Sequence, residues 1–146
     1  MSITGLPVFD KTVHTTNTWL HEITSRLGWD DRRKGYRALQ ASLHALRDQM
    51  PLTEVAKFSA QLPILLRGVF FEGWRPLAKP TKVRSKGDFL AGLRDAFPNE
   101  RDFDAEAAFR EVIAVIKFHI SAGEIEDVQR AMPKEIKELL DEDIPG

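Results

Sequence analysis

Cysteine is absent from the chain, and its absence removes several classes of protein at once. Without thiols there is no disulfide scaffold, no cysteine zinc site, no thiol catalysis and no iron–sulfur ligation. Long apolar runs are missing too, because the most apolar stretch, Ile64 to Phe71, is interrupted by Arg67 and Gly68. A membrane helix needs about 20 apolar residues. Since the N-terminus also lacks a signal-peptide pattern, we expect a cytoplasmic protein with no membrane partner.

Motifs that carry chemistry are missing as well. The sequence contains no serine nucleophile elbow, phosphate loop or dinucleotide glycine motif. No pair among the four histidines has the i and i+4 spacing typical of zinc ligands. We therefore predict no catalytic residue, no metal and no cofactor, and we expect a protein that is not an enzyme. An enzyme without a recognisable motif is the third of our functional hypotheses.

What the 146 residues do contain is helical spacing of apolar residues. Sets such as Tyr36, Leu39, Leu43, Leu46 and Met50 recur every three or four residues and place one apolar stripe on one helix face. Alternating strand-like segments are missing. The pattern predicts an all-α protein of one domain.

Helix start signals support this prediction. Asp30 or Asp31 can cap a helix that runs to Met50 before Pro51, and Asp104 can cap a helix that runs to Ile120. Ser121 and Glu124 have the capping-box spacing, in which each side chain binds the free N–H of the other residue.

An internal repeat organises the chain. When residues 19–70 are shifted by 70, 14 of their 19 large apolar residues fall on large apolar residues of 89–140, against about seven expected by chance. Pro63 falls on Pro133 and Glu54 on Glu124. Because proline disrupts a helix interior, we predict that the third helix of each half is broken at these prolines.

The predicted architecture is thus a helical bundle of two pseudo-symmetric halves that share one core. Repeat 1 covers about 13–71, the connector 72–87 and repeat 2 about 88–140, with about three helices in each repeat. The segment from Pro63 to Phe71 is apolar nearly all round, which is typical of a helix that is central or covers an interface.

Charge is divided between the two halves. Residues 1–86 carry 14 Lys and Arg and 7 Asp and Glu, a net charge of +7. Residues 87–146 carry 7 Lys and Arg and 15 Asp and Glu, a net charge of −8. The total of −1 therefore hides a basic first half and an acidic second half. The basic run includes Lys79 and Lys82, and the acidic end includes Glu142 and Asp143. Three interpretations follow: attraction between the halves of one chain, self-association, or binding of a phosphate-bearing partner to the basic half.

The best polar cluster is His44, Arg47 and Asp48. These residues lie at i, i+3 and i+4 on one predicted helix and are within mutual reach. Arg47 could grip a carboxylate or phosphate through two hydrogen bonds. The alternative is a surface ion pair with little effect on stability. Trp29 and Trp74 are interpreted as packing residues that hold loop ends to the core, with an exposed aromatic patch as the alternative.

Four ordered segments resemble a bacterial family of uncharacterised proteins, the domain of unknown function numbered 2267. They are TTNTWLHEITSRLGW (15–29), LHALRDQMP (43–51), QLPILLRGVFFEGW (61–74) and SAGEIEDVQRAMP (121–133). The resemblance implies a small helical bacterial protein and brings no activity. By similarity, the family's recurrent positions are Trp29, His44, Arg47, Asp48, Arg67, Glu72 and Trp74. Gln49, Phe70 and Phe71 depart from the family pattern.

Our leading functional hypothesis is a non-enzymatic binding or assembly module, with itself or an unidentified protein or small molecule as partner. It would act through the first half and connector, with His44, Arg47, Asp48, Arg67, Glu72 and Trp74 as candidate contacts. The alternative is binding of nucleic acid or another phosphate partner by the basic half.

Overall fold

The computed structural model describes residues 1–77 and 83–141, and within these ranges it contains helices and turns but no strand. The helices are α1 (Pro7–Leu27), α2 (Arg32–Gln49), α3 (Leu52–Ala60), α4 (Ile64–Phe71), α5 (Lys86–Arg94), α6 (Ala105–His119), α7 (Ala122–Ala131) and α8 (Lys134–Leu140). The predicted all-α class is confirmed. No helix in these ranges is both long and apolar enough to cross a membrane. Lys79, Lys82, Glu142 and Asp143 lie outside the described residues.

Helices α2 and α6 begin where their capping residues predict. The side chains of Asp31 and Asp104 each accept a backbone N–H of the first turn at 2.9 Å. Such a bond satisfies one of the four N–H groups that a helix start leaves without a partner.

The predicted capping box at the start of α7 is half right. The Ser121 hydroxyl accepts the N–H of Glu124 at 3.2 Å. The N–H of Ser121, however, donates to Oε1 of Gln61 at 3.3 Å rather than to the carboxylate of Glu124. Glu124 is free to turn elsewhere, and its oxygens meet Glu54 and Asp127 instead.

The breaks at proline occur as predicted. Pro63 and Pro133 are the N-cap residues of α4 and α8, so the third helix of each half is the pair α3 and α4 or the pair α7 and α8. The connector is shorter than predicted, because Ser85 caps α5 by accepting the N–H of Asp88 at 3.1 Å. Helix α5 is also short, with 9 residues against 21 in α1.

The two parts of the third helix begin at the same offset in both halves. Shifted by 70, α3 begins where α7 begins and α4 begins where α8 begins. The internal duplication itself stays a prediction, since equal boundaries do not establish equal packing of the helices. What the structure does show is that Glu54 and Glu124, equivalent under this shift, come to lie beside each other where α3 packs on α7.

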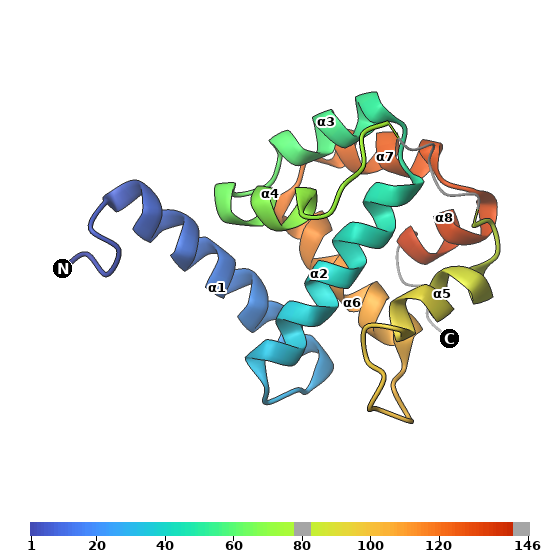
Figure 1. Cartoon of the computed structure of the whole chain (residues 1–146), viewed down its shortest axis with the longest axis horizontal. Coiled ribbons are helices and arrows are strands. Elements are labelled where there is room, and N and C mark those ends of the chain that lie inside the picture. The colour runs from blue at the N-terminus through green and yellow to red at the C-terminus, as the bar shows by residue number, and fades with distance from the viewer. Residues whose placement is uncertain (78–82, 142–146) are drawn as a thin grey trace.

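The buried apolar residues form one cluster that draws on all eight helices. Helix α1 packs on α2 and α6, and α2 also contacts α4, α5 and α6 (Figure 1). The largest fully buried side chains are Trp19, Phe58, Phe70, Phe97 and Phe109. Trp29 packs on Phe97 and Phe103, and Trp74 packs on Phe71, in keeping with their interpretation as packing residues.

Helix α1 extends past this core at its N-terminal end. In Figure 1 its first turns project away from the other helices. Thr12 marks the place where α1 meets α4, because its hydroxyl accepts the backbone N–H of Leu65 at 2.9 Å. The residues before Thr12 therefore form an overhang.

The crossing of α1 and α2 depends on a glycine. A Cβ atom on Gly35 would lie 2.6 Å from Cγ2 of Thr24, far inside van der Waals contact. Thr24 cannot easily turn away, because its hydroxyl donates to the backbone oxygen of Leu20 at 3.0 Å. Gly35 thus lets two long helices approach closely.

We expect G35A to lower the free energy of unfolding by about 1–2 kcal/mol, because overpacking outweighs the better helix propensity of alanine. In a T24S background, which removes the obstructing methyl group, the same substitution should be neutral or stabilising. Urea denaturation of the wild type, G35A, T24S and the double variant T24S/G35A measures both effects. G92A is the control, since a Cβ there meets nothing within 4 Å. Equal effects of G35A in both backgrounds would rule out the steric explanation.

Candidate functional site

Two of the sequence-predicted site residues hold the C-terminal end of α4. Nε2 of His44 lies 2.7 Å from the backbone oxygen of Val69. Nη1 of Arg47 donates to the backbone oxygens of Phe70 and Glu72 at 2.9 and 2.8 Å. The last carbonyls of a helix have no partner within the helix and carry partial negative charge. Both side chains of α2 therefore stabilise the end of α4.

The other predicted residues extend this arrangement. Asp48 accepts a hydrogen bond from Nε of Arg47 at 2.9 Å and is half exposed. Glu72 accepts from Gln40 at 3.1 Å. Trp74 packs on Phe71 with ring centroids 5.3 Å apart. Five of the six predicted contacts thus meet around the end of α4, where the guanidinium of Arg47 is already bound to backbone.

Arg67 lies apart from this group. Its guanidinium donates to the backbone oxygens of Ser59 and Leu62, both at 3.0 Å. These carbonyls belong to the end of α3 and the turn that follows. Arg67 thus stabilises the end of α3 as Arg47 stabilises the end of α4.

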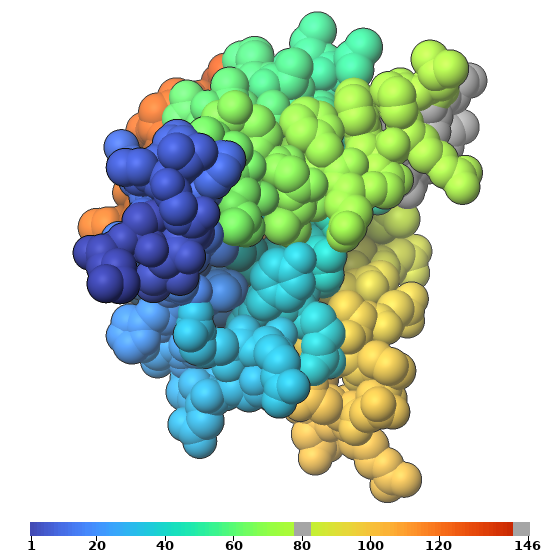
Figure 2. Space-filling model, turned by 60° about the vertical axis from the view of Figure 1, so that its left-hand side comes forward, coloured from blue at the N-terminus to red at the C-terminus, as the bar shows by residue number. Residues whose placement is uncertain are grey.

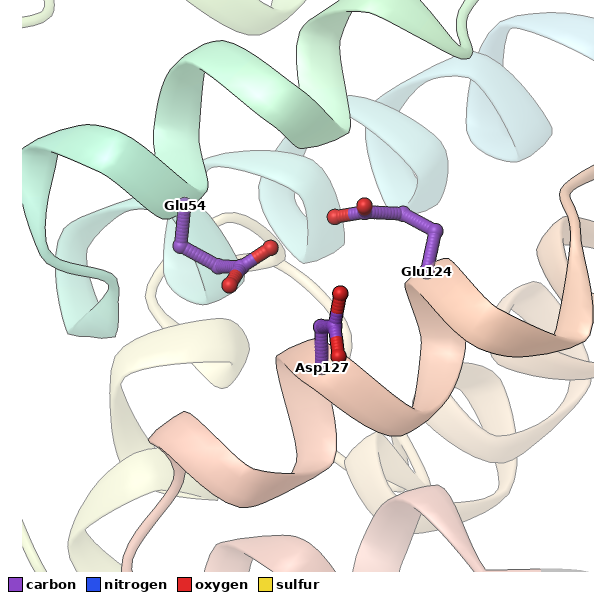
Figure 3. Close-up of side chains that lie close together, drawn as sticks. All are labelled: Glu54, Glu124 and Asp127. Atoms are coloured by element: carbon purple, nitrogen blue, oxygen red, sulfur yellow. The ribbon is translucent and has the colours of Figure 1, made fainter.

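Sequence inspection missed a carboxylate cluster between α3 and α7. Oxygen atoms of Glu54, Glu124 and Asp127 lie within 4.8 Å of one another, and Figure 3 shows Glu54 reaching from α3 toward the two acids of α7. The side chain of Glu124 is buried, with 6% of the residue exposed. Oε2 of Glu54 and Oε2 of Glu124 are both buried and have no hydrogen-bond partner. The signal that could have revealed the cluster is the identical acid at positions 54 and 124 of the repeat.

Two basic residues neutralise one side of the cluster. Nζ of Lys57 lies 2.7 Å from Oδ2 of Asp127 and 3.9 Å from Oε2 of Glu54, and Arg130 pairs with Oδ1 of Asp127. The hydrogen bond from Lys57 lowers the pKa of Asp127, and the same bond raises the pKa of Lys57. Asp127 is therefore ionised at neutral pH, and its charge is matched.

Glu124 lies on the side of the cluster without a base. Burial and the neighbouring carboxylate of Glu54 together raise the pKa of Glu124 to about 7. Two facing carboxyl groups in an apolar setting do not both ionise readily, so Glu124 keeps its proton to a higher pH than an exposed glutamate does. Three oxygen ligands suit a hard divalent cation. Here the ammonium of Lys57 already lies between Asp127 and Glu54, and the proton supplies the remaining positive charge.

A groove of about 800 Å³ lies between α1, α6 and the end of α8. Charged side chains of both signs line it, and the exposed ring of Phe118 is on its wall. Next to the groove, His119 stacks on Trp19 with ring centroids 4.7 Å apart and approaches Oε1 of Glu22 at 2.6 Å. None of the predicted site residues lines this groove.

Several ion pairs join the basic first half to the acidic second half. They are Arg26–Glu111 at 2.7 Å, Lys34–Glu100 at 2.9 Å, Lys57–Asp127 at 2.7 Å and Lys86–Glu106 at 2.9 Å. The divided charge of the sequence is therefore matched in part within one chain.

Together, fold and polar clusters define a small all-α protein in which buried charged residues tie helices to one another. The chain belongs to the family of uncharacterized conserved proteins DUF2267, whose model matches residues 16–139. The resemblance inferred from the four segments is thus confirmed. No curated protein matches the sequence significantly.

Proposed function

We propose that this protein is a non-enzymatic assembly module that forms a homo-oligomer through its first half and connector. The observation that carries the proposal is the distribution of exposed apolar side chains. Of the ten large apolar residues exposed in the described ranges, nine belong to the first half and connector: Met1, Ile3, Leu6, Val8, Phe9, Leu52, Ile64, Leu65 and Leu77. Several of these residues lie where α1 meets α4, and a large exposed apolar patch is typical of an interaction site.

A non-enzymatic role agrees with the use of the polar side chains. His44, Arg47 and Arg67 bind backbone carbonyls at helix ends. A catalytic base or an anion-binding group needs an open face toward a substrate. The described polar clusters therefore favour a structural role over a reaction.

The alternative, binding of a phosphate-bearing partner, is weakened by the ion pairs between the halves. Arg26, Lys34, Lys57 and Lys86 each face an acid of the second half. Fluorescence anisotropy of a labelled oligonucleotide tests this alternative. Binding that weakens steeply between 50 and 200 mM salt, as it does when phosphate contacts dominate, would support it over assembly.

Sedimentation velocity at low and high salt tests the assembly proposal. We expect an oligomer at about 100 µM protein that persists in 500 mM NaCl, because apolar contacts are not screened by salt. An oligomer seen only at low salt would instead indicate pairing of the basic half with the acidic half. A monomer under both conditions would contradict the proposal.

A further inference from the structure

The overhang of α1 exposes apolar side chains to solvent. Leu6, Val8 and Phe9 are each about half exposed. Val8 and Phe9 lie four and three residues before Thr12, so they share its face of the helix. Thr12 binds the start of α4, and this face therefore continues onto α4.

Helix α4 adds two more exposed apolar residues at that point. Ile64 and Leu65 form its first turn, and both are exposed. In Figure 2 the N-terminal residues and α4 face the viewer together, and the bond between Thr12 and Leu65 joins the two helices there. We call the surface made by Leu6, Val8, Phe9, Ile64 and Leu65 the α1–α4 surface.

The area of the α1–α4 surface suits a protein partner. Its five side chains expose on the order of 500 Å² of apolar area, whereas a stable interface buries about 800 Å² per partner, of which somewhat more than half is apolar. A partner that covers the overhang would remove this apolar area from water.

The charge around the α1–α4 surface favours a second copy of the chain. From Met1 to His14 there is one acid, Asp10, and one base, Lys11. Arg67, on α4, binds backbone oxygens. A nucleic acid or an anionic lipid surface would require an excess of positive charge. In a two-fold interface each patch meets an identical patch of the partner. A neutral patch can pair in this way, whereas a patch with charge of one sign repels its copy.

We propose that two copies of the chain pair through their α1–α4 surfaces about a two-fold axis, with the overhang of each copy covering its partner. This inference rests on the proposed function, since it names the surface through which the module assembles. Val8 and Phe9 lie outside the core cluster, so their replacement leaves the fold of each protomer intact.

Sedimentation velocity of the double variant V8S/F9S, at about 100 µM in 500 mM NaCl, tests the surface. We expect it to lose the dimer, whereas the control F118S, which removes an exposed ring elsewhere, should keep it. Circular dichroism verifies that both variants are folded. A dimer that survives V8S/F9S would overturn the α1–α4 surface and leave the proposed function standing, whereas a monomeric wild type would overturn both.

The absence of cysteine permits a second test. In F9C the introduced thiol is the only one in the chain, so a bismaleimide can link only two copies at that position. We expect a covalent dimer from F9C and little from the control F118C. Equal yields from the two variants would overturn the proposal. Co-sedimentation of the wild type with vesicles of anionic phospholipid, lost in V8S/F9S, would assign the surface to a membrane and would also overturn it.

Discussion

Replacing Arg47 by alanine is expected to lower the free energy of unfolding by about 3 kcal/mol. The side chain is buried, and its guanidinium holds the backbone oxygens of Phe70 and Glu72 at the end of α4. Hydrogen bonds to a charged group contribute about 1.5–3 kcal/mol, and leaving a buried acceptor without a partner costs about 1–3 kcal/mol more. Water that enters the space offsets part of this loss. Urea denaturation measures the difference.

Asp48 provides the matched control on the same helix. It contacts the same guanidinium but is half exposed, so D48A should change stability by no more than about 0.5 kcal/mol. R47K should fall between R47A and the wild type, because an ammonium can reach one carbonyl but lacks the planar fork. If R47A costs less than about 1 kcal/mol, the arginine does not stabilise the end of α4 and is available for another role.

The sequence predicted the helices well because their signals are local. Asp31, Asp104, Pro63 and Pro133 act within a few residues of their own position, and each lies at the helix boundary expected from capping or from proline geometry. The same local reasoning made the predicted connector too long. The hydroxyl of Ser85 caps α5 within the segment that was expected to be irregular.

The structure brings three of the predicted site residues together on α2, whereas their role as contacts for a ligand or partner stays a prediction. Spacing on one helix correctly brought His44, Arg47 and Asp48 together. It could not show that the partners of His44 and Arg47 would be backbone oxygens 23 to 25 residues further along the chain. A helix end offers carbonyls whatever its side chains are, so no residue pattern identifies such a partner.

The carboxylate cluster was hidden for a different reason. Glu54 and Glu124 are 70 residues apart, and each alone is an ordinary acid in the first turn of a helix. Only the packing of α3 on α7 makes them neighbours. Their identity under the repeat offset was visible in the sequence, but contact between equivalent positions depends on how the two halves are arranged in space.

The stability of the protein should fall as the pH rises from 5 to 8, because of Glu124. Its pKa in the folded protein is about 7, above the usual 4.5 of the unfolded chain. Between these values the folded state binds more protons than the unfolded state, so each step up in pH favours unfolding. The stability contributed by the proton is complete below about pH 4.5 and is lost as the pH passes 7, for a total of up to about 3 kcal/mol.

The variant E124Q isolates this effect, because its amide, like the protonated acid, carries no charge, and it stays uncharged at every pH. We expect E124Q and the wild type to have similar stability at pH 5 and E124Q to be more stable by about 2 kcal/mol at pH 8, measured by urea denaturation in EDTA. E126Q, an exposed position of the same helix, is the control and should follow the wild type. Parallel pH profiles for E124Q and the wild type would mean that the folded protein does not raise the pKa of Glu124. If the difference at pH 8 appears in EDTA and disappears when CaCl₂ or MnCl₂ is added, a divalent cation can replace that proton.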